Sequence, residues 1–473
     1  MKSPLLDEII AELDGSISLS NGVVSVNDEG KLRAKAHRLA EISALDSGEM
    51  QASARYLTRA AALAIGIYPA SIHEVYMARG RGNIPSTFTV PAMNLRALSY
   101  DAARAVFRVA NEMDAGAMLF EIARSEIGYT AQRPAEYATN MLAAAITEGY
   151  RGPVFIQGDH FQVSAKRYAS DPDGEFSVIR DLITEAIQAG FYNIDVDTST
   201  LVDLSKATVA EQQALNAELS AMFTEYIRQQ EPEGITVSVG GEIGEVGGKN
   251  SNEEELRAYT DGFNRKMAER SPDAAGLSKI SIQTGTSHGG VVLADGTLAQ
   301  VSIDFDTLKN LNQVARDEYK MAGAVQHGAS TLPQEAFGKF TESEACEVHL
   351  ATNFQNMMYD RLPDELRDEM YAYLDKNHAD ERKPDQTDEQ FYYKTRKRGI
   401  GAFKSKLWGL SKDAKAEICM AWEEQFRLLF TLLNVGDTRK YVDEFTTPVE
   451  VPPNAAAYQI AEVESEDTSD LAD

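Results

Sequence analysis

Eight short β-rich runs alternating with amphipathic helices restrict the fold of this chain more than any other feature. The clearest are PVFIQGD at 153–159 and KISIQTG at 279–285. The other six candidate strands are 87–94, 117–122, 192–197, 235–242, 322–327 and 346–352. Intervening helices such as VIRDLITEAIQAG end near glycine or proline, as helices commonly do. Eight β–α units in order favour a (β/α)8 TIM barrel, and an open, doubly wound sheet is the alternative.

The segments on either side of these units have apolar residues at helical spacing. We therefore predict a helical N-terminal extension at 1–85, a TIM-barrel catalytic domain at 86–360 and a C-terminal helical extension at 361–450. Within the first, ASARYLTRAAALAIGIY at 52–68 is expected to be helical. The last segment, 451–473, has a proline pair and an acidic run, and is predicted to be a flexible tail.

Composition excludes several classes of partner. The formal net charge of −27 opposes binding to nucleic acid and to anionic membranes. The chain has only two cysteines, no signal-like apolar run at the N-terminus, and no apolar stretch near the roughly 20 residues that a membrane helix needs. We expect a cytoplasmic protein without nucleic-acid or membrane partners. The amphipathic terminal helices predict a homodimer or a higher homo-oligomer.

Polar residues follow several predicted strands, where the catalytic groups of a barrel gather. Asp159 and His160 follow one strand, Glu242 closes another, and His288 and His327 come after the next two. Imidazoles that converge from different strands are typical of a zinc site, or a site for another divalent transition metal, with an open coordination position. Glu242 is a fourth or alternative ligand. Three other histidines lie in the helical extensions and are assigned no role: His37, His73 and His378.

Glycine-rich strings accompany two of these histidines. GTSHGG at 285–290 and HGAS at 327–330 contain small residues that let backbone N–H groups approach an anion, with hydroxyls as further donors. A single string of this kind is usually a turn. Two of them beside histidines at successive strand ends predict a phosphate cradle next to a metal.

From about 87 to 356 the sequence resembles the class II, metal-dependent fructose-bisphosphate and tagatose-bisphosphate aldolases. VPAMN resembles the first strand of that family, GDH at 158–160 its Asp–His metal motif, and GFYNIDVDTS its fourth strand. GGEIGEVGG at 240–248 resembles the segment after strand five, and GTSHGG and HGAS match the two later histidine motifs. The two terminal extensions lie outside the resemblance, which indicates an enlarged member.

The resemblance implies a role for each matching residue. His160, His288 and His327 would hold the divalent metal, Zn²⁺ or another transition ion, with Glu242 close to it. Asp159 would be the catalytic residue that exchanges a proton with the C4 hydroxyl, and Asp197 would support the metal site. The residues implied in binding substrate and phosphate are Asn94, Gly289, Gly328, Ser330 and Thr352.

Two departures from the family pattern lie ahead of the Asp–His pair and in the loop after strand five. Gln157 stands where the family often has histidine, and Asn250 stands where a loop glutamate usually moves a proton. The acidic run 253–255 (Glu253, Glu254, Glu255) would substitute if the loop is shifted; otherwise it is the acidic start of a helix.

Two further departures concern substrate recognition. At strand eight the family's Asn–x–Asp–Thr–Asp becomes His349 to Asn353, with Ala351 in place of the first aspartate. His349 and Asn353 are candidate substrate contacts, and His349 is alternatively a metal neighbour or a structural residue. Arg96 and Arg124 are candidates for a second phosphate, or ordinary surface residues.

The expected activity is reversible cleavage of fructose 1,6-bisphosphate to dihydroxyacetone phosphate and glyceraldehyde 3-phosphate, within glycolysis and gluconeogenesis. A divalent metal would stabilise the enediolate that forms when the carbon–carbon bond beside the ketone breaks. Its partners would then be phosphorylated ketoses and triose phosphates. The alternatives are a tagatose-bisphosphate or other phosphorylated-ketose aldolase, and a non-catalytic, aldolase-like partner subunit.

Overall fold

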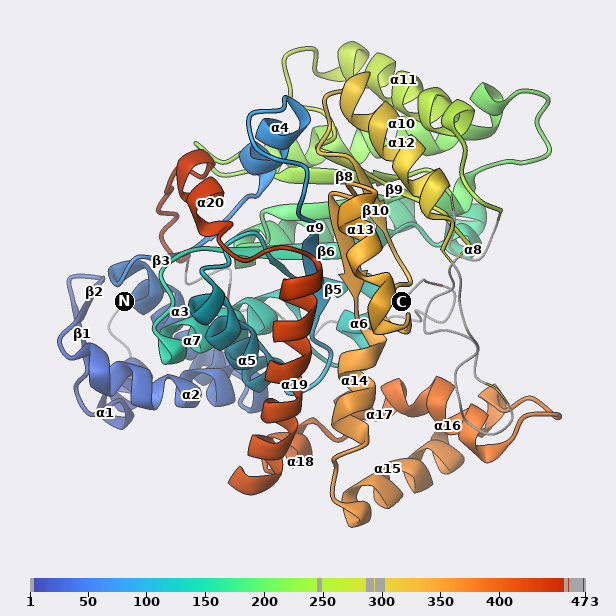
Figure 1. The fold of residues 1–473 in the computed structure, drawn as a ribbon. Helices are drawn as coiled ribbons and strands as arrows, with labels where there is room; N and C mark the ends of the chain where they lie inside the picture. Colours follow the sequence, from blue (N-terminus) through green and yellow to red (C-terminus); the bar gives the residue numbers. More distant parts are fainter. Residues whose placement is uncertain are drawn as a thin grey trace.

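Eight parallel strands form a closed barrel in the computed structural model, which describes residues 4–244, 249–285, 293, 303–454, 458 and 471 (Figure 1). Each strand pairs with the next along the chain, and the last pairs with the first, so the open-sheet alternative is wrong. All eight predicted strands are confirmed. They are β4 (Val90–Asn94), β5 (Leu119–Ala123), β6 (Gly152–Gln162), β7 (Asn193–Asp197), β8 (Ser238–Glu242), β9 (Lys279–Ile282), β10 (Ala324–Gln326) and β11 (Glu347–Leu350).

Helices surround the barrel and cover its outer face (Figure 1). The first seven are α5 (Ser99–Met113), α6 (Arg124–Tyr129), α7 (Pro134–Glu148), α8 (Ala165–Ser170), α9 (Pro172–Ala189), η1 (Ser199–Leu201) and α10 (Val209–Gln230). The others are α11 (Glu253–Arg270), α12 (Phe305–Asp317), η2 (Gln334–Ala336), α13 (Gly338–Glu342) and α14 (Thr352–Tyr359). In α9 the Asp171 side chain accepts a hydrogen bond from the Gly174 N–H, and the helix stops before Gly190 at φ 104°.

The N-terminal extension contains strands as well as helices. Its elements are α1 (Pro4–Glu12), β1 (Ile17–Ser20), β2 (Val23–Val26), α2 (Glu29–Leu45), α3 (Gly48–Ala64), β3 (Ile67–Ala70) and α4 (His73–Gly80). The predicted helix at 52–68 is wrong at its end, because β3 pairs in parallel with the first residues of β6. Gly66 has a left-handed φ of 74°, and Pro69 cannot continue a helix, so the chain turns out of α3 here.

Helix α4 covers the N-terminal ends of the barrel strands. Arg79 is 1% exposed and donates hydrogen bonds to four carbonyls that precede β4, β10 and β11, those of Phe88, Ala322, Glu344 and Ala345. A Cβ on Gly80 would lie 2.1 Å from the Lys320 carbonyl oxygen, so only glycine fits this approach. The N-terminal extension is therefore part of the barrel's closure.

His73, at the start of α4, is expected to make stability depend on pH. It is 6% exposed, and burial, with added repulsion from Arg228 and Arg81, lowers its pKa from 6.5 to about 4. The unfolded chain therefore binds more protons than the folded chain between pH 6.5 and 4, and stability falls as the pH falls through this window. That pKa difference corresponds to at most about 3 kcal/mol.

Chemical denaturation of the wild type and His73→Gln at pH 7.5 and 4.5, both in chelator, checks this. The wild type should lose more free energy of unfolding than the variant, since all other titrating groups are shared. Equal losses in the two proteins would contradict the assignment.

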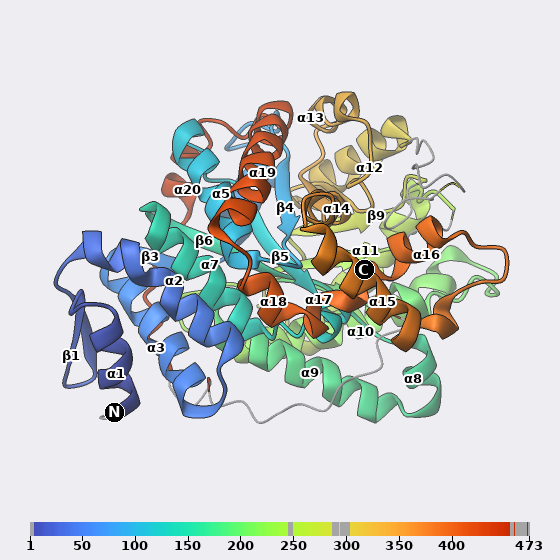
Figure 2. The same cartoon turned by 90° about the horizontal axis from the view of Figure 1, so that it is seen from below.

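The C-terminal extension reaches the opposite end of the barrel. It consists of α15 (Asp364–Asn377), η3 (Ala379–Glu381), α16 (Asp388–Thr395), η4 (Arg396–Arg398), α17 (Gly399–Ala402), α18 (Lys404–Trp408), α19 (Lys412–Leu432) and α20 (Arg439–Phe445). Helix α19 packs on α5, and α17 packs on α6, which follows β5. In Figure 2, seen from below, α15 and α17 lie in front of the barrel, at the end away from α4 in Figure 1.

The predicted tail lies mostly outside the described residues, which include 451–454, 458 and 471. Of these, Tyr458 is buried. No helix in the described part of the chain is long and apolar enough to cross a membrane.

Candidate active site

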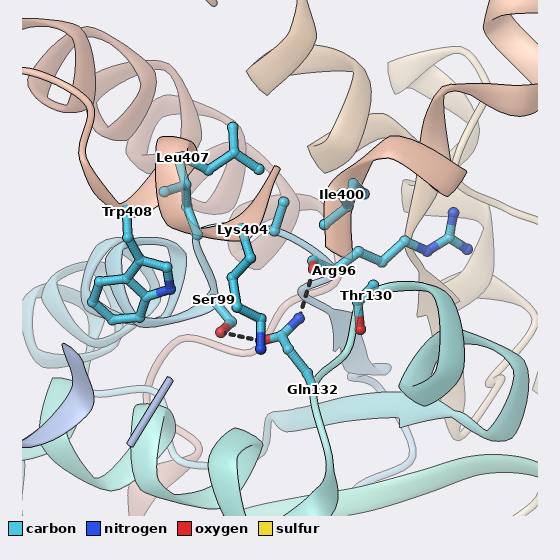
Figure 3. Close-up of a pocket in the computed structure, with 10 residues that line it drawn as sticks. Arg96, Ser99, Thr130, Gln132, Ile400, Lys404, Leu407 and Trp408 are labelled. Carbon is cyan, nitrogen blue, oxygen red and sulfur yellow. Dashed lines mark hydrogen bonds between the residues drawn. The ribbon is translucent and has the colours of Figure 1, made fainter. Parts of the chain in front are cut away.

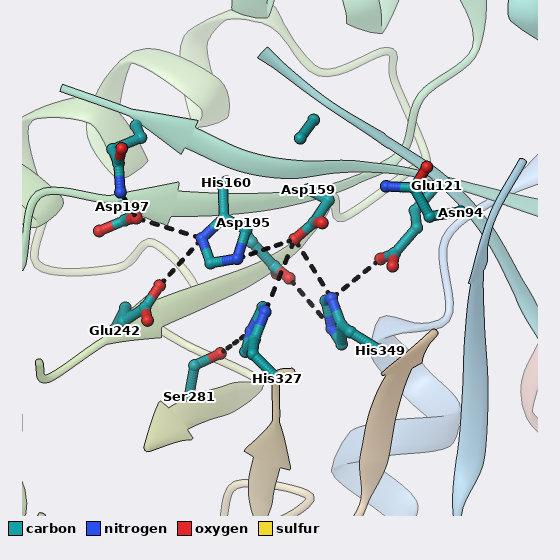
Figure 4. Close-up of polar contacts among 12 residues, drawn as sticks. Asn94, Glu121, Asp159, His160, Asp195, Asp197, Glu242, Ser281, His327 and His349 are labelled. Atoms are coloured by element: carbon teal, nitrogen blue, oxygen red, sulfur yellow. Dashed lines mark hydrogen bonds and ion pairs between the residues drawn. The ribbon is translucent and has the colours of Figure 1, made fainter. Parts of the chain in front are cut away.

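An irregularity in β6 places two adjacent polar side chains inside the barrel. The pairing of β6 with β7 shifts between Gly158 and Phe161, and His160 has a left-handed φ of 40°. In a regular strand neighbouring side chains point to opposite faces, whereas a bulge re-aims one of them. Asp159 and His160 are both buried, and both lie among the polar residues of the barrel interior (Figure 4).

His160 and His327 approach each other from β6 and from the end of β10, with ring centroids 4.2 Å apart. His160 Nδ1 lies 3.1 Å from Asp197 Oδ2, and His327 Nε2 lies 2.9 Å from Ser281 Oγ. These contacts fix the two rings and turn their other nitrogens toward Asp159 Oδ1, at 3.6 Å from His160 Nε2 and 4.0 Å from His327 Nδ1. Metal-bound histidines characteristically have such a partner on the second nitrogen.

Glu242, the last residue of β8, lies at the Nδ1 edge of the His160 ring, and Asp159 lies at the Nε2 edge. Glu242 Oε2 is 3.1 Å from His160 Nδ1, beside Asp197. Burial, followed by repulsion from Asp197, raises the pKa of Glu242 to about 8. The structure therefore places Glu242 within the predicted cluster but against Nδ1, the nitrogen that Asp197 also contacts.

These residues fit a divalent transition metal. Donor atoms of His160, Glu242 and His327 lie within 4.8 Å of one another, and those of Asp159, His327 and His349 form a second such group. Imidazole and carboxylate donors suit zinc and neighbouring transition ions. The third predicted histidine ligand, His288, and the predicted phosphate ligand Gly289 lie outside the described residues.

A network of buried charges below this cluster was not predicted from the sequence. Lys279 Nζ lies 2.5 Å from Glu347 Oε1 and 3.0 Å from Asp195. These two ion pairs favour the protonated form of the lysine. Burial lowers its pKa, but Asp195 and Glu347 outweigh this and raise it above the usual range. Gln157, the residue in place of the family's histidine, donates to Glu121 and Glu347. A protonated, ion-paired lysine cannot act as a Schiff-base nucleophile.

His349 joins the network to the cluster above it. Its Nε2 lies 2.6 Å from Glu347 Oε1, and its Nδ1 lies 3.0 Å from Glu121 Oε2 and 3.2 Å from Asp159 Oδ1. Its ring centroid is 3.9 Å from that of His327. The structure thus places His349 beside the His160–His327 cluster.

The other predicted substrate-binding residues lie at the ends of β4, β10 and β11. Asn94 is buried and donates to Glu126 through its side-chain amide. Gly328 has a left-handed φ of 68°, and Ser330 Oγ accepts a hydrogen bond from the Ala351 N–H. This bond brings the HGAS string beside the start of α14, where Thr352 is buried and Asn353 is half-buried.

The acidic residues after β8 form a helix start. Asn252 caps α11, its side chain accepting from the Glu255 N–H while Glu255 accepts from the Asn252 N–H. Asn250 donates to Asp304. Glu255 is thereby held in a capping box and an ion pair with Lys249, so the helix-start interpretation of 253–255 is confirmed for it.

Neither arginine considered for a second phosphate is a surface residue. Arg96 pairs with Glu126 at 2.7 Å, and Arg124 pairs with Glu175 at 2.6 Å, all four side chains being at most 4% exposed. Figure 3 shows the Arg96 guanidinium directed away from Ser99, Gln132 and Lys404, with α17 and α18 covering this loop. Both guanidiniums are engaged by carboxylates, which does not support either as a phosphate ligand.

Known proteins share the sequence pattern and the fold of this chain. The family described as fructose-bisphosphate aldolase class-II matches residues 85–406, more than half of the chain. The structure titled a probable tagatose 6 phosphate kinase from Sinorhizobium meliloti 1021 is 14% identical, with 75% of this chain and 99% of that chain covered and a TM-score of 0.51, which shows the same fold.

Two further solved structures are similar at lower TM-scores. The fructose-bisphosphate aldolase from Campylobacter jejuni is 16% identical, with 79% and 97% of the two chains covered and a TM-score of 0.47. The YdjI aldolase from Escherichia coli K12 is 14% identical, with 73% and 99% covered and a TM-score of 0.40. From the match over residues 85–406, the chain belongs to the class-II fructose-bisphosphate aldolase family.

Proposed function

We propose that this chain is a divalent-metal-dependent aldolase that reversibly cleaves a phosphorylated ketose, with fructose 1,6-bisphosphate as the leading substrate. The observation that carries the proposal is the position of the Asp159 carboxylate, which faces His160 Nε2 and His327 Nδ1 at 3.6 and 4.0 Å. A proton acceptor beside metal-binding nitrogens is the combination that cleavage next to a ketone requires.

In this proposal His160 and His327 hold the metal, together with His288, as the family resemblance implies. The cation would stabilise the negative charge that develops at the ketone oxygen during cleavage. Asp159 takes the proton from the C4 hydroxyl as the carbon–carbon bond breaks and returns it in the reverse direction. Asp197 and Ser281 keep the two imidazoles oriented, and the barrel interior excludes bulk water from the proton acceptor.

Substrate range is the part of the proposal that depends on the departures at strand eight. Ala351 and Asn353 remove both carboxylates that the family places there, and Arg96 and Arg124 are already paired with glutamates. Tagatose bisphosphate or another phosphorylated ketose is therefore the second candidate. A non-catalytic partner subunit is less consistent with the site, because a scaffold has no physical need for a buried carboxylate facing two oriented imidazoles.

An assay of purified protein tests the proposal. Cleavage of fructose 1,6-bisphosphate and of tagatose 1,6-bisphosphate is measured by triose-phosphate release, before chelation, after chelation and after Zn²⁺ is restored. We expect turnover of at least one ketose that is abolished by chelation and recovered with metal, since the developing charge loses its counter-ion. Protein that binds metal but cleaves neither ketose would contradict both named substrates and leave another phosphorylated ketose or the partner-subunit alternative.

A further inference from the structure

We propose that Tyr76, on helix α4 of the N-terminal extension, is a positioning residue for the proton acceptor Asp159 and acts through Glu347 and His349. The inference rests on the proposed role of Asp159 and concerns how that carboxylate is held. Tyr76 precedes residue 85, where the match to the aldolase family begins. The proposal therefore gives a part of the chain outside the matched residues an effect on the reaction.

Tyr76 is a hydrogen-bond donor with a fixed position. Its side chain is 1% exposed, and its hydroxyl donates to Glu347 Oε2. Burial, followed by repulsion from Glu347, raises the pKa of Tyr76 well above its usual range, so the phenol keeps the proton that it donates. Arg79, three residues further along α4, donates to four backbone carbonyls at the N-terminal ends of the strands. Because residues three apart share a helix face, these bonds hold the face that carries Tyr76 against the barrel.

Tyr76 orients the Glu347 carboxylate, because it donates to one carboxylate oxygen while three other groups gather at the second. Lys279 Nζ, Gln157 Nε2 and His349 Nε2 lie 2.5, 3.1 and 2.6 Å from Oε1, respectively. A buried carboxylate oxygen that loses its donor is costly. Without the Tyr76 hydroxyl, Glu347 is therefore expected to rotate toward the donors at Oε1, which moves the atom that His349 contacts.

His349 transmits the orientation of Glu347 to Asp159. Glu347 and His349 are two residues apart on β11, so both side chains point to the same face of the strand, the barrel interior. With Nε2 held at Glu347, His349 Nδ1 lies 3.2 Å from Asp159 Oδ1 and 3.0 Å from Glu121 Oε2. Figure 4 shows His349 and Asp159 directed toward each other across the interior. Because the imidazole ring is rigid, a shift at Nε2 also shifts Nδ1.

A displaced Asp159 carboxylate should cost rate rather than substrate affinity. Proton transfer requires the acceptor to lie within hydrogen-bond reach of the substrate hydroxyl. A displacement of roughly 1 Å can cost about 10²-fold in rate, even when its origin is far from the reacting atoms. Tyr76 reaches the site through Glu347 and His349, so loss of its hydroxyl should leave KM and the zinc content nearly unchanged.

Steady-state kinetics of Tyr76→Phe, which removes only the hydroxyl, tests the inference. We expect kcat for ketose-bisphosphate cleavage to fall about 10-fold, with KM and zinc per chain as in the wild type. Tyr150→Phe is the matched control, because Tyr150 is also buried and its hydroxyl donates to the Pro153 carbonyl at the start of β6. It should keep the wild-type kcat. A wild-type kcat in Tyr76→Phe, or an equal loss in both variants, would overturn the inference.

A double-mutant cycle separates positioning through His349 from a general structural role. If Tyr76 acts through His349, adding Tyr76→Phe to His349→Asn should lower kcat no further than His349→Asn does by itself. Residues that act independently give additive effects, whereas residues in one network do not. A further 10-fold loss in the His349→Asn background would overturn the inference.

Crystal structures of the wild type and Tyr76→Phe in one crystal form decide the inference without turnover, and also if His349→Asn fails to fold. We expect the side chains of Glu347, His349 and Asp159 to be displaced in Tyr76→Phe, and those of His160 and His327 to stay in place. An unmoved Asp159 would overturn this inference alone. A displaced Asp159 in a protein whose wild type cleaves no ketose would support the chain of contacts and overturn the proposed function alone.

Discussion

Asparagine in place of Asp159 is expected to lower kcat for ketose-bisphosphate cleavage by about 10²–10⁴-fold, the usual contribution of a positioned proton acceptor. The amide has nearly the same shape as the carboxylate, so substrate should still bind and KM should change little. A fall in kcat and in kcat/KM by equal factors is the signature of an interaction made only in the transition state. Steady-state kinetics of the Asp159→Asn variant, with saturating Zn²⁺, measures this.

A control variant separates proton transfer from other effects. Asp203→Asn changes an exposed carboxylate in the loop after β7, where Asp203 accepts from Ser205, and should leave kcat unchanged. A rise in KM with unchanged kcat in Asp159→Asn would make Asp159 a binding residue and contradict its assignment.

The barrel was predictable because its strands are buried on both sides and read as continuous apolar runs between amphipathic helices. The strand β3 was not predictable from the sequence, because Ile67–Ala70 follows a helical segment and only Gly66 and Pro69 mark the change from helix to strand. Its pairing partner, the first part of β6, is more than 80 residues away in the chain. No local pattern reports a pairing of that kind.

Within the site, three of the residues that were predicted and described lie next to glycine, either in the second half of β6 or directly after β10. Asp159, His160 and His327 have that context, which topology alone brings to one end of a barrel. The residues that were missed lie inside strands. A signal for them was present, since Glu121 interrupts MLFEIA and Glu347 interrupts CEVHLA. A charged residue within a strand that is otherwise apolar must face the barrel interior and needs a charged or metal partner there.

The partners themselves could not be read from the sequence. Lys279 stands in KISIQTG, a run with several polar residues, and nothing in that run indicates that its ammonium meets Glu347 across the barrel. The bulge in β6 is a further example. It depends on a left-handed φ at His160, a histidine rather than a glycine, and so has no compositional mark.

Methionine in place of Lys279 is expected to lower the free energy of unfolding by about 3–5 kcal/mol, which is the usual cost of breaking one side of a buried ion pair. Lys279 is fully buried, and its Nζ contacts Glu347 Oε1 at 2.5 Å, Gln157 Oε1 at 2.8 Å and Asp195 at 3.0 Å. Methionine fills a similar volume but leaves both carboxylates in the barrel interior without their ammonium partner. Urea denaturation of metal-free wild type and variant measures the difference.

The matched control is Lys266→Met, because Lys266 forms its ion pairs with Glu218 and Glu269 at the surface of α11, where its side chain is 30% exposed. Exposed pairs contribute little, so this change should stay within about 1 kcal/mol of the wild type. Adding Glu347→Gln to Lys279→Met should recover part of the lost stability, since it removes one of the two buried carboxylates that lost their ammonium partner. Equal stability of Lys279→Met and Lys266→Met would show that another group compensates the buried charges, and would contradict the importance assigned to the Lys279 ion pairs.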